Sequence, residues 1–387
     1  MHVVVLPSWY PEFPGDINGC FFREQAIALN KVVQKVGVLY PQMLGFSALK
    51  SGLGRREIEV VNDSGLPTYR YHFTNTVPYF EKIIHRGWLK KGEALFVKYI
   101  EEHGMPDILH AHSLFKAGFL AQYLSRKYNI PFVVTEHITA YARDNISGKK
   151  ITQAKPVIES ASACIAVSNE FSTLLNRTFV TNKWQYIPNI VSNDFLLHQI
   201  NSEKTSKENF HFINVCALLP KKRVDILIKA FAIACKTLNN ISLDIGGDGP
   251  EATRLQELVT ELGLNDRVSL LGSLTRDQVK EKMYEADVFV LSSEYETFGV
   301  VVVEALALGK PVIATKCGGP ETIVSNEVGT LIEKNSPEAM AEAMIQMYRQ
   351  YEKFDKYEIR AYCDREFSEH SVVGRLVETY HTAISNK

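Results

Sequence analysis

Two glutamates, Glu296 and Glu304, are separated by seven residues and have the type and spacing to do chemistry together. The first lies in a polar loop after a short apolar strand, and the second lies about two turns inside a predicted helix. Three backbone N–H groups open that helix without partners inside it, those of Phe298, Gly299 and Val300. Because a helix start binds phosphate well, the segment predicts an anion site beside two carboxylates. The alternative is that Glu296 only caps the helix and that Glu304 is a solvated helix residue.

The strands and the helix around these glutamates are predicted from short apolar runs. Asp287–Leu291 and Pro311–Thr315 have the composition of strands buried on both faces of a parallel sheet. A parallel pair needs a crossover of about a dozen residues, usually a helix, so Phe298–Leu308 is predicted to be helical. The competing interpretation is a strand, because Val300–Val303 are β-branched. Gly309, with a proline two residues later, is typical of the end of a helix and favours the helical interpretation.

The motif pattern in this segment resembles that of a known enzyme family. Glu296 is followed by Thr-Phe-Gly, Glu304 opens the run EALALGKPVIAT, and a Gly-Gly-Pro-Glu turn ends at Glu321. This arrangement is similar to the signature of the retaining nucleotide-sugar glycosyltransferases of family four, the group 1 glycosyltransferases. The resemblance implies an α/β protein with the GT-B fold, in which two Rossmann-like doubly wound parallel-sheet domains face a cleft. It also implies that the anomeric configuration of the sugar is retained.

The resemblance assigns roles to residues that match the family's motifs. Glu296 and His112 are the expected catalytic residues: Glu296 would orient the donor sugar, and His112 would line its anomeric side. Glu304 would hold the ribose hydroxyls. The complete expected nucleotide-sugar site is Gly19, Lys222, Gly247, Leu274, Phe298, Gly299, Val300 and Glu304. The chain has no D-x-D motif, so no metal and no cofactor is expected, and Lys222 with the helix-start amides would offset the diphosphate charge.

One family position departs from the pattern. The family places an arginine and a lysine on the diphosphate; Lys222 matches the lysine, but the position of the arginine is Ala217. Arg223 or Lys221 is the candidate replacement, and plain surface charge is the alternative explanation of both. The expected donor is a UDP-sugar rather than a GDP-sugar.

Alternating strand and helix patterns in the first half indicate a parallel doubly wound sheet that begins with His2–Leu6. The loop after this strand contains Gly15 and Gly19, which would let the backbone approach a phosphate or a sugar. His110 and His112 share one face of a later strand and could bind a metal, but no third ligand has suitable spacing.

The chain has 387 residues, of which 45% are hydrophobic and 22% charged, as is typical of a soluble globular protein with two domains. We expect an acceptor-binding domain at residues 1–195, a nucleotide-sugar-binding domain at 210–365, and a C-terminal helix at 366–387 that packs back on the first domain. The six cysteines form no C-x-x-C pair, which fits reduced thiols. No signal peptide and no 18-residue apolar run is evident, so we expect a cytoplasmic protein, with the inner face of the membrane as a further candidate location.

Charge is distributed unevenly between the two halves. Residues 1–195 carry 21 Lys and Arg against 16 Asp and Glu, whereas residues 196–387 carry 22 against 28. A basic first half favours an anionic acceptor or an anionic membrane surface, and the helix predicted at Ile83–Glu101 mixes Trp88 with cations as interfacial helices do. The alternative is that this helix packs one face on the sheet. The charge is too scattered for a nucleic-acid interface.

Together these features predict a retaining glycosyltransferase that moves a hexose-type sugar from a nucleoside diphosphate sugar to a glycan or lipid-linked acceptor. The opening LPSWYP resembles enzymes of bacterial surface polysaccharide synthesis. Two alternatives are a non-hydrolysing nucleotide-sugar epimerase of the same fold and a non-enzymatic two-domain sugar-binding protein. An NAD-dependent oxidoreductase is disfavoured because no G-x-G-x-x-G follows the first strand.

Overall fold

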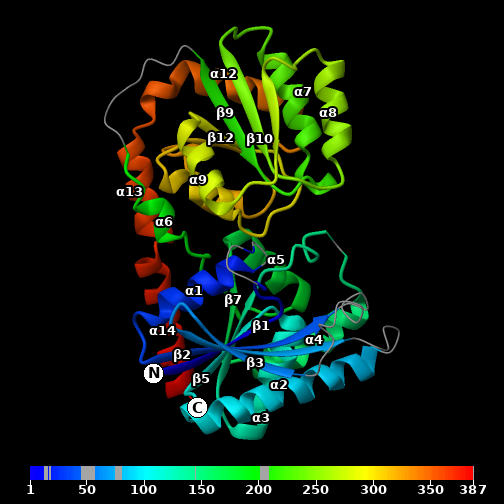
Figure 1. Cartoon of the computed structure of the whole chain (residues 1–387), viewed down its shortest axis with the longest axis vertical. Helices are drawn as coiled ribbons and strands as arrows, with labels where there is room; N and C mark the ends of the chain where they lie inside the picture. Colours follow the sequence, from blue (N-terminus) through cyan, green and yellow to red (C-terminus); the bar gives the residue numbers. More distant parts are fainter. Residues whose placement is uncertain are drawn as a thin grey trace. The chain divides into compact units, whose positions relative to one another are not determined.

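The chain folds into two compact α/β units (Figure 1). The computed structural model describes residues 1–12, 16, 19–44, 57–74, 81–143, 145–200 and 209–386. The first unit contains Met1–Val167, Ser172–Ile187 and Val372–Lys387, and the second contains Ser168–Phe171 and Pro188–Ser371. The last helix of the chain, α14 (Glu369–Ser385), therefore groups with the first unit from Val372 onward.

The boundary between the units lies earlier in the sequence than predicted. We predict residues 1–195 for the first domain, whereas Pro188 already belongs to the second unit. The short helix α6 (Asn193–Leu196) explains the difference, because its Phe195 is buried in the second unit with the Arg276 guanidinium 4.9 Å from the ring centre. Residues 201–208 of the predicted linker, like Gly15 of the predicted glycine loop, lie outside the described residues.

The first unit is built on a sheet with the strand order β3-β4-β2-β1-β5-β6-β7-β8. Its strands are β1 (His2–Pro7), β2 (Lys35–Leu44), β3 (Glu57–Asp63), β4 (Leu66–Thr74), β5 (Ile108–His112), β6 (Phe132–Glu136), β7 (Ala163–Ala166) and β8 (Trp184–Tyr186). All neighbouring strands are parallel except β3 and β4. The predicted parallel sheet is thus confirmed apart from this one edge. β1 and β5 are buried at every residue, as strands covered on both faces must be.

The antiparallel edge follows from a tight turn between β3 and β4. Ser64 and Gly65 both have positive φ angles, 56° and 88°, as a type I′ hairpin turn requires. The Asn62 side-chain oxygen accepts a hydrogen bond from Gly65 N–H at 2.8 Å, which fixes the turn. The sequence prediction missed this edge because polar residues interrupt the strand patterns on both sides of the turn.

Helices cover both faces of the first sheet, and α2 and α3 lie side by side on one of them (Figure 1). The helices of this unit are α1 (Cys20–Asn30), α2 (Glu81–His103), α3 (Phe119–Tyr128), α4 (Gly148–Ser160), α5 (Asn169–Phe179) and α14. A single π turn, η2 (Leu114–Gly118), leads from β5 into α3. Trp88 of α2 is buried, so this helix packs one face on the sheet, as the alternative interpretation has it.

The second unit has a fully parallel sheet with the strand order β11-β10-β9-β12-β13-β14. Its strands are β9 (Phe210–Val215), β10 (Ile241–Gly246), β11 (Val268–Gly272), β12 (Val288–Leu291), β13 (Val312–Thr315) and β14 (Gly329–Ile332). Its longer helices are α7 (Val224–Ala234), α8 (Ala252–Glu261), α9 (Arg276–Glu285), α10 (Val300–Ala307), α12 (Pro337–Gln350) and α13 (Lys356–Phe367), and a short helix, α11 (Pro320–Ile323), follows β13. The order reverses between β9 and β12, the switch point at which open α/β sheets bind ligands.

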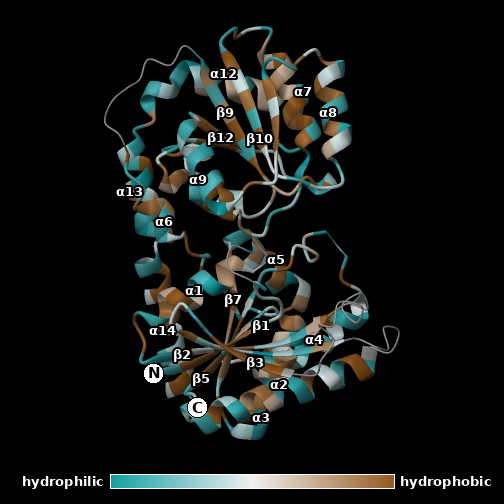
Figure 2. Cartoon of the chain, viewed as in Figure 1, coloured by the Kyte–Doolittle hydropathy of each residue, from teal (hydrophilic) through white to brown (hydrophobic). Residues whose placement is uncertain are grey.

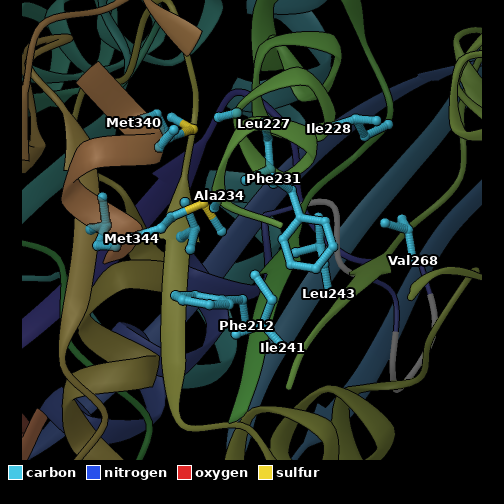
Figure 3. Packing of buried hydrophobic residues seen from close by; sticks show 14 of the residues in the cluster. Phe212, Leu227, Ile228, Phe231, Ala234, Ile241, Leu243, Val268, Met340 and Met344 are labelled. Atoms are coloured by element: carbon cyan, nitrogen blue, oxygen red, sulfur yellow. The ribbon is translucent and has the colours of Figure 1, made fainter. Parts of the chain in front are cut away.

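The core of the second unit lies between this sheet and the helices α7 and α12. Phe212 and Leu243 project from the sheet toward Phe231 of α7, and Met340 and Met344 of α12 close the cluster from the other side (Figure 3). Hydrophobic residues concentrate in the strands and on the sheet-facing side of helices such as α7 (Figure 2). This packing gives rigid support to the loops at the carboxyl ends of the strands.

The four consecutive valines lie in a helix, so the helical prediction is confirmed. They open α10, which crosses over between the parallel strands β12 and β13. Val302 and Val303 are completely buried, and their burial outweighs the weak helix propensity of β-branched residues.

Candidate active site

The loop after β12 carries Glu296 and is held in place by a glycine turn. Glu296 N–H donates to Cys317 O at 3.0 Å, and Gly319 N–H donates to Glu296 O at 2.9 Å. A Cβ atom at Gly319 would lie 2.0 Å from Phe298 O, so only glycine lets the two loops come this close. The Gly-Gly-Pro-Glu turn therefore positions the Glu296 loop.

The Glu296 carboxylate lies in a mostly buried ion pair. It accepts hydrogen bonds from Lys222 Nζ at 2.5 Å and from Ser293 Oγ at 2.7 Å. Burial raises the pKa of Glu296, but the Lys222 ammonium and the Ser293 hydroxyl outweigh burial, so this pKa lies below its usual value. Burial likewise lowers the pKa of Lys222, and the Glu296 carboxylate more than offsets this, so the pKa of the ammonium is raised. Both groups are therefore charged at neutral pH.

The loops after β9 and β12 are joined by hydrogen bonds, which place Lys222 beside the carboxylate. Lys222 ends a short 3₁₀ turn, η3 (Pro220–Lys222), that follows β9. Its carbonyl oxygen accepts Ser292 Oγ–H at 2.8 Å, and Lys221 O accepts Glu294 N–H at 2.8 Å. The pair lies at the carboxyl ends of two adjacent parallel strands, where the sheet order reverses.

Arg223, a candidate for the missing family arginine, has partners of its own. Its guanidinium pairs with Asp225 at 3.1 Å and also donates to the Asn335 side chain. Arg223 caps α7 in the left-handed conformation, with φ 47°. It could meet a diphosphate only after leaving Asp225, whereas Lys222 is already at the switch point.

Glu304 is buried inside α10 and only 1% exposed. One carboxylate oxygen pairs with Arg276, the first residue of α9, while the other, Oε2, has no hydrogen-bond partner among the described residues. Burial raises the pKa of Glu304, and Arg276 offsets only part of this effect. A buried acceptor without a donor is costly, so Oε2 is suited to accept a hydrogen bond from a ligand hydroxyl.

The start of α10 lies next to this carboxylate. Gly299 caps the helix and Phe298 is buried, so the first N–H groups of Val300 and its neighbours open the helix without partners inside it. These groups carry the positive end of the helix dipole. The start of α10 thus has the N–H groups on which the predicted anion site depends, and the binding of an anion there stays a prediction.

Gly247 and Leu274 lie at the ends of β10 and β11. Gly247 has φ 131°, and a Cβ atom there would lie 1.8 Å from Cys216 O, so the loop after β9 requires glycine at this position. The Leu274 side chain packs against Gly246. A pocket of about 670 Å³ opens beside Gly247 and is lined by this glycine, Leu218 and one face of α8.

In the first unit, His112 ends β5 within a buried aromatic cluster. Its Nδ1 lies 3.1 Å from His137 Nε2, and its ring packs on Phe22 with 4.6 Å between the centres. Burial lowers the pKa of His112 well below its usual value and that of His137 to about 3, so both rings are neutral. Between two neutral imidazoles, one nitrogen donates and the other accepts. The pairing fixes the orientation of the His112 ring.

His110 does not act as a metal ligand with His112. Its Nε2 lies 2.8 Å from Thr135 Oγ1, and its Nδ1 lies 2.6 Å from Tyr380 Oη of α14. Both ring nitrogens are thus used within the fold. Among the described residues, no group of His, Cys, Asp and Glu side chains is arranged to hold a metal ion.

Gly19 caps α1 in the left-handed conformation beside Trp9.

Glu136, at the end of β6, accepts hydrogen bonds from the N–H groups of Leu114, His137 and Ile138, and burial raises its pKa. This carboxylate therefore fixes the loops after β5 and β6.

Most of the predicted nucleotide-sugar residues lie in the second unit. Lys222, Gly247, Leu274, Glu296 and the start of α10 lie in the second unit, as does Glu304, whereas Gly19 and His112 lie in the first unit. Ser293, Arg276 and Gly319 contact the predicted residues but were not themselves predicted from the sequence. Only Gly319 could have been found in the sequence, because it belongs to the Gly-Gly-Pro-Glu turn. Ser293 and Arg276 contact the two glutamates through the positions of their loops, and hydrophobic periodicity does not predict loop positions.

Comparisons with known proteins agree with this geometry. Residues 198–363 match the family described as glycosyl transferases group 1, and residues 49–195 match glycosyltransferase family 4. An uncharacterized glycosyltransferase of Methanocaldococcus jannaschii is 28% identical over 285 residues, which cover 72% of this chain and 76% of that one. The N-acetyl-alpha-D-glucosaminyl L-malate synthase of Bacillus anthracis is 31% identical over 259 residues, 64% of this chain and 66% of that one. The structure of Anabaena HepE in complex with UDP superimposes with a TM-score of 0.76 and 22% identity, covering 99% of this chain and all of that chain.

Two further observations bear on the interpretation. Among the described residues, no helix is both long and apolar enough to cross a bilayer. The two matched families together span both units and are both glycosyltransferase families, which argues against the epimerase and the sugar-binding protein. The chain is a glycosyltransferase with the GT-B fold and belongs to the group 1 glycosyltransferases of family 4.

Proposed function

We propose that the protein transfers a hexose-type sugar from a nucleoside diphosphate sugar with retention of configuration and without a metal ion. The observation that carries this proposal is the buried Lys222–Glu296 pair beside the start of α10. A cation, a carboxylate and unpaired amides meet where the sheet order reverses, which suits a diphosphate joined to a sugar.

Each group of the second unit has a role in this proposal. Lys222 and the helix-start amides bind the diphosphate and stabilise the charge that develops on it as it leaves. Glu296 accepts hydrogen bonds from sugar hydroxyls, and Glu304 Oε2 accepts one from the ribose. His112 of the first unit presents a neutral imidazole to the sugar. The acceptor attacks from the face that the diphosphate leaves, and a phosphate oxygen of the donor takes its proton.

The donor in this proposal is a UDP-sugar rather than a GDP-sugar. Support comes from Anabaena HepE, a structural relative solved in complex with UDP. The name of the Bacillus anthracis relative specifies an alpha-linked product, as expected of retention from an alpha-linked donor. These points concern the relatives and serve here as the basis of the proposal.

The acceptor in this proposal is a glycan or a lipid-linked molecule of bacterial surface polysaccharide synthesis. The protein would then act in the cytoplasm at the inner face of the membrane. Lys82, Arg86 and Lys90 are exposed along the first half of α2 and could contact an anionic bilayer surface.

A ligand panel tests the donor part of the proposal. Thermal unfolding is measured with UDP, GDP, ADP and NAD at equal concentrations, because a ligand at 100 times its dissociation constant adds about 2.7 kcal/mol of stability. UDP alone is expected to raise the unfolding temperature, with and without a chelator. No shift with any nucleoside diphosphate would overturn the proposal.

The proposed retention of configuration is tested on the product of sugar transfer. A UDP-sugar identified by the panel is incubated with the protein and candidate acceptors, and the anomeric proton of the product is followed by NMR from the first turnover. Retention predicts an alpha product from an alpha-linked donor. A beta product, or sugar epimerisation with release of free UDP and no acceptor, would contradict it.

A further inference from the structure

The segment that follows β5 has an unusual backbone. Ser113 adopts φ 76° and ψ 144°, and Lys116 adopts φ 64° and ψ −78°. Residues with a Cβ atom rarely occupy these regions, and the conformation of Lys116 corresponds to a strained γ-turn. Such strain persists only where the surrounding structure imposes it, and it occurs mostly at functional sites.

A buried serine imposes this conformation. Ser8, directly after β1, places its Oγ 2.8 Å from His112 O and 2.6 Å from Phe115 O. The same Oγ accepts a hydrogen bond from Ala117 N–H at 3.2 Å. One side chain therefore holds both ends of the turn that presents Lys116, directly after the strand that ends at His112.

Two cations without acidic partners flank this turn. Lys116 is exposed, and Lys150, in the first turn of α4, is exposed as well. Neither forms an ion pair or a side-chain hydrogen bond with the residues that the structure describes. The protein packed around Lys116 restricts its hydration and lowers the pKa of its ammonium. A cation without an acidic partner on a strained turn is suited to bind an anion.

An aromatic surface lies next to Lys150 and includes Phe115, which directly precedes Lys116 in the chain. Lys150 Nζ is 5.8 Å from the centre of the Phe115 ring, which is half-buried. Phe115 stacks nearly parallel to Tyr141, with 6.4 Å between the ring centres and 8° between the planes. Flat aromatic faces next to cations suit a sugar that carries a charged group.

We propose that Lys116 and Lys150, with Phe115, form the acceptor site of the first unit, and that the acceptor carries a phosphate or diphosphate. The proposal rests on the proposed function, because it identifies this site with the acceptor of sugar transfer. A soluble sugar phosphate and a lipid-linked sugar diphosphate share this chemistry. Both would place the anion on the lysines and the sugar ring on Phe115.

Lysine acetylation measured peptide by peptide tests the site directly. The labelling rates of Lys116 and Lys150 are compared in pyrophosphate and in chloride at equal ionic strength, because screening alone affects all exposed lysines alike. Both rates are expected to fall several-fold in pyrophosphate, while the rate of Lys98, which pairs with Glu102 on α2, stays the same. Equal rates in the two salts would overturn the proposal.

A second comparison separates the two sources of the phosphate. Phosphatidylcholine vesicles with and without a polyprenyl diphosphate replace the salts. Protection by the polyprenyl vesicles indicates a lipid-linked acceptor, and protection by pyrophosphate alone indicates a soluble sugar phosphate. Either result supports the site, whereas the absence of both forms of protection contradicts it.

Two variants distinguish this site from the donor site. Lys116→Gly relieves the backbone strain, so its unfolding temperature is expected to stay equal or rise, while pyrophosphate no longer protects Lys150. Lys116→Met keeps the side-chain length and should lose the same protection. Stabilisation by UDP should be unchanged in both variants. If UDP does not stabilise the wild-type protein, this result contradicts the proposed function. The protection of the lysines is a separate measurement and still decides whether they bind an anion.

Discussion

The carboxyl ends of the two sheets carry different kinds of buried polar groups. In the second unit this edge is charged, because Lys222 pairs with Glu296 and Arg276 pairs with Glu304. In the first unit the three clustered histidines at this edge are neutral, because burial strongly lowers their pKa values, that of His112 among them. The buried carboxylate of Glu136 at the same edge is held by backbone N–H groups rather than by a cation. One edge of the molecule thus pairs its buried carboxylates with cations, and the other does not.

Under the proposed function, this difference suits each edge to a different part of the donor. Buried charges are stable only when paired, so an anion that enters the second unit can exchange partners with groups that are already ionised. A neutral imidazole such as His112 offers a donor or an acceptor without attracting counter-ions, which suits an uncharged sugar. The same difference makes the two units respond differently to acid.

The largest expected effect is a selective loss of stability of the first unit in acid. The pKa values of His110 and His137 are lowered from 6.5 to about 3, so the stability that they contribute is complete above pH 6.5 and is lost as the pH falls below it. Below pH 6.5 each ring lowers the free energy of unfolding by about 1.4 kcal/mol per pH unit, so that both rings together lower it by about 5.5 kcal/mol over two pH units. In the second unit, the stability that comes from the lowered pKa of Glu296 is lost only below pH 4.5. The raised pKa of Glu304 has the opposite effect and adds stability as the pH falls.

Tryptophan fluorescence can follow the unfolding of the first unit selectively, because all three tryptophans, Trp9, Trp88 and Trp184, lie in that unit. Urea unfolding is followed by fluorescence and by circular dichroism at about pH 7.5 and about pH 5, which brackets the histidine window. The fluorescence midpoint is expected to fall further than the dichroism midpoint. His137→Gln should reduce the difference, and His370→Gln, an exposed change in the second unit, should not. Equal shifts of both signals would contradict the comparison.

Breaking the charged pair of the second unit should have the next largest effect. Lys222→Met leaves Glu296 buried without its cation, at a cost of about 3–5 kcal/mol in the free energy of unfolding. Lys316→Met is the matched control: its partner is Glu333, the pair is exposed to solvent, and the free energy of unfolding is expected to change little. Urea unfolding followed by circular dichroism measures both.

A double variant separates stability from activity at the same pair. Glu296→Gln combined with Lys222→Met removes both charges and should recover most of the lost stability. Stabilisation by UDP and sugar transfer should remain lost, because the diphosphate no longer meets a cation. A double variant with normal transfer would show that the pair is structural only.

Glu304→Gln tests the buried acceptor and has a smaller effect. A charged acceptor contributes about 1.5–3 kcal/mol to a hydrogen bond, so UDP affinity should fall roughly 10- to 100-fold. The stability of the unliganded protein should change little, because Arg276 is 29% exposed and can remain hydrated. Calorimetric titration with UDP measures the affinity, and Glu281→Gln, an exposed change on α9, is the control. Wild-type affinity of Glu304→Gln would exclude contact with the nucleotide.

The sequence predicted those parts of the second unit that depend on local periodicity and motif spacing. The strand before Ser292, the helix from Val300 and the turn at Gly319 were all readable, because each has its own apolar run or glycine signal. Arg276 and Ser293 were not readable as partners of the two glutamates. Their contacts depend on how the loops after separate strands meet, which is a property of the sheet order rather than of any one segment.

Fewer features of the first unit could be predicted from the sequence, because they too depend on contacts between distant segments. The antiparallel β3 rests on a two-residue turn at Ser64–Gly65 within a polar stretch, and the strain at Lys116 is imposed by Ser8, more than one hundred residues away. The second compact unit begins at Pro188, before the predicted boundary at residue 195, because Phe195 packs into that unit. Long-range contacts decided each of these features.

The smallest expected effect concerns the helix that ends the chain. Tyr380 Oη lies 2.6 Å from the buried Nδ1 of His110, so Tyr380→Phe should cost about 1–3 kcal/mol in the first unit by leaving a buried nitrogen without a partner. Tyr362→Phe is the matched change in the second unit, where the hydroxyl donates to Ile323 O at 2.8 Å, and should cost about 1 kcal/mol. Only Tyr380→Phe should move the tryptophan fluorescence midpoint. If it does not, α14 unfolds separately from the sheet, and the edge of the first unit that carries the neutral histidines is stable without the helix that closes the chain.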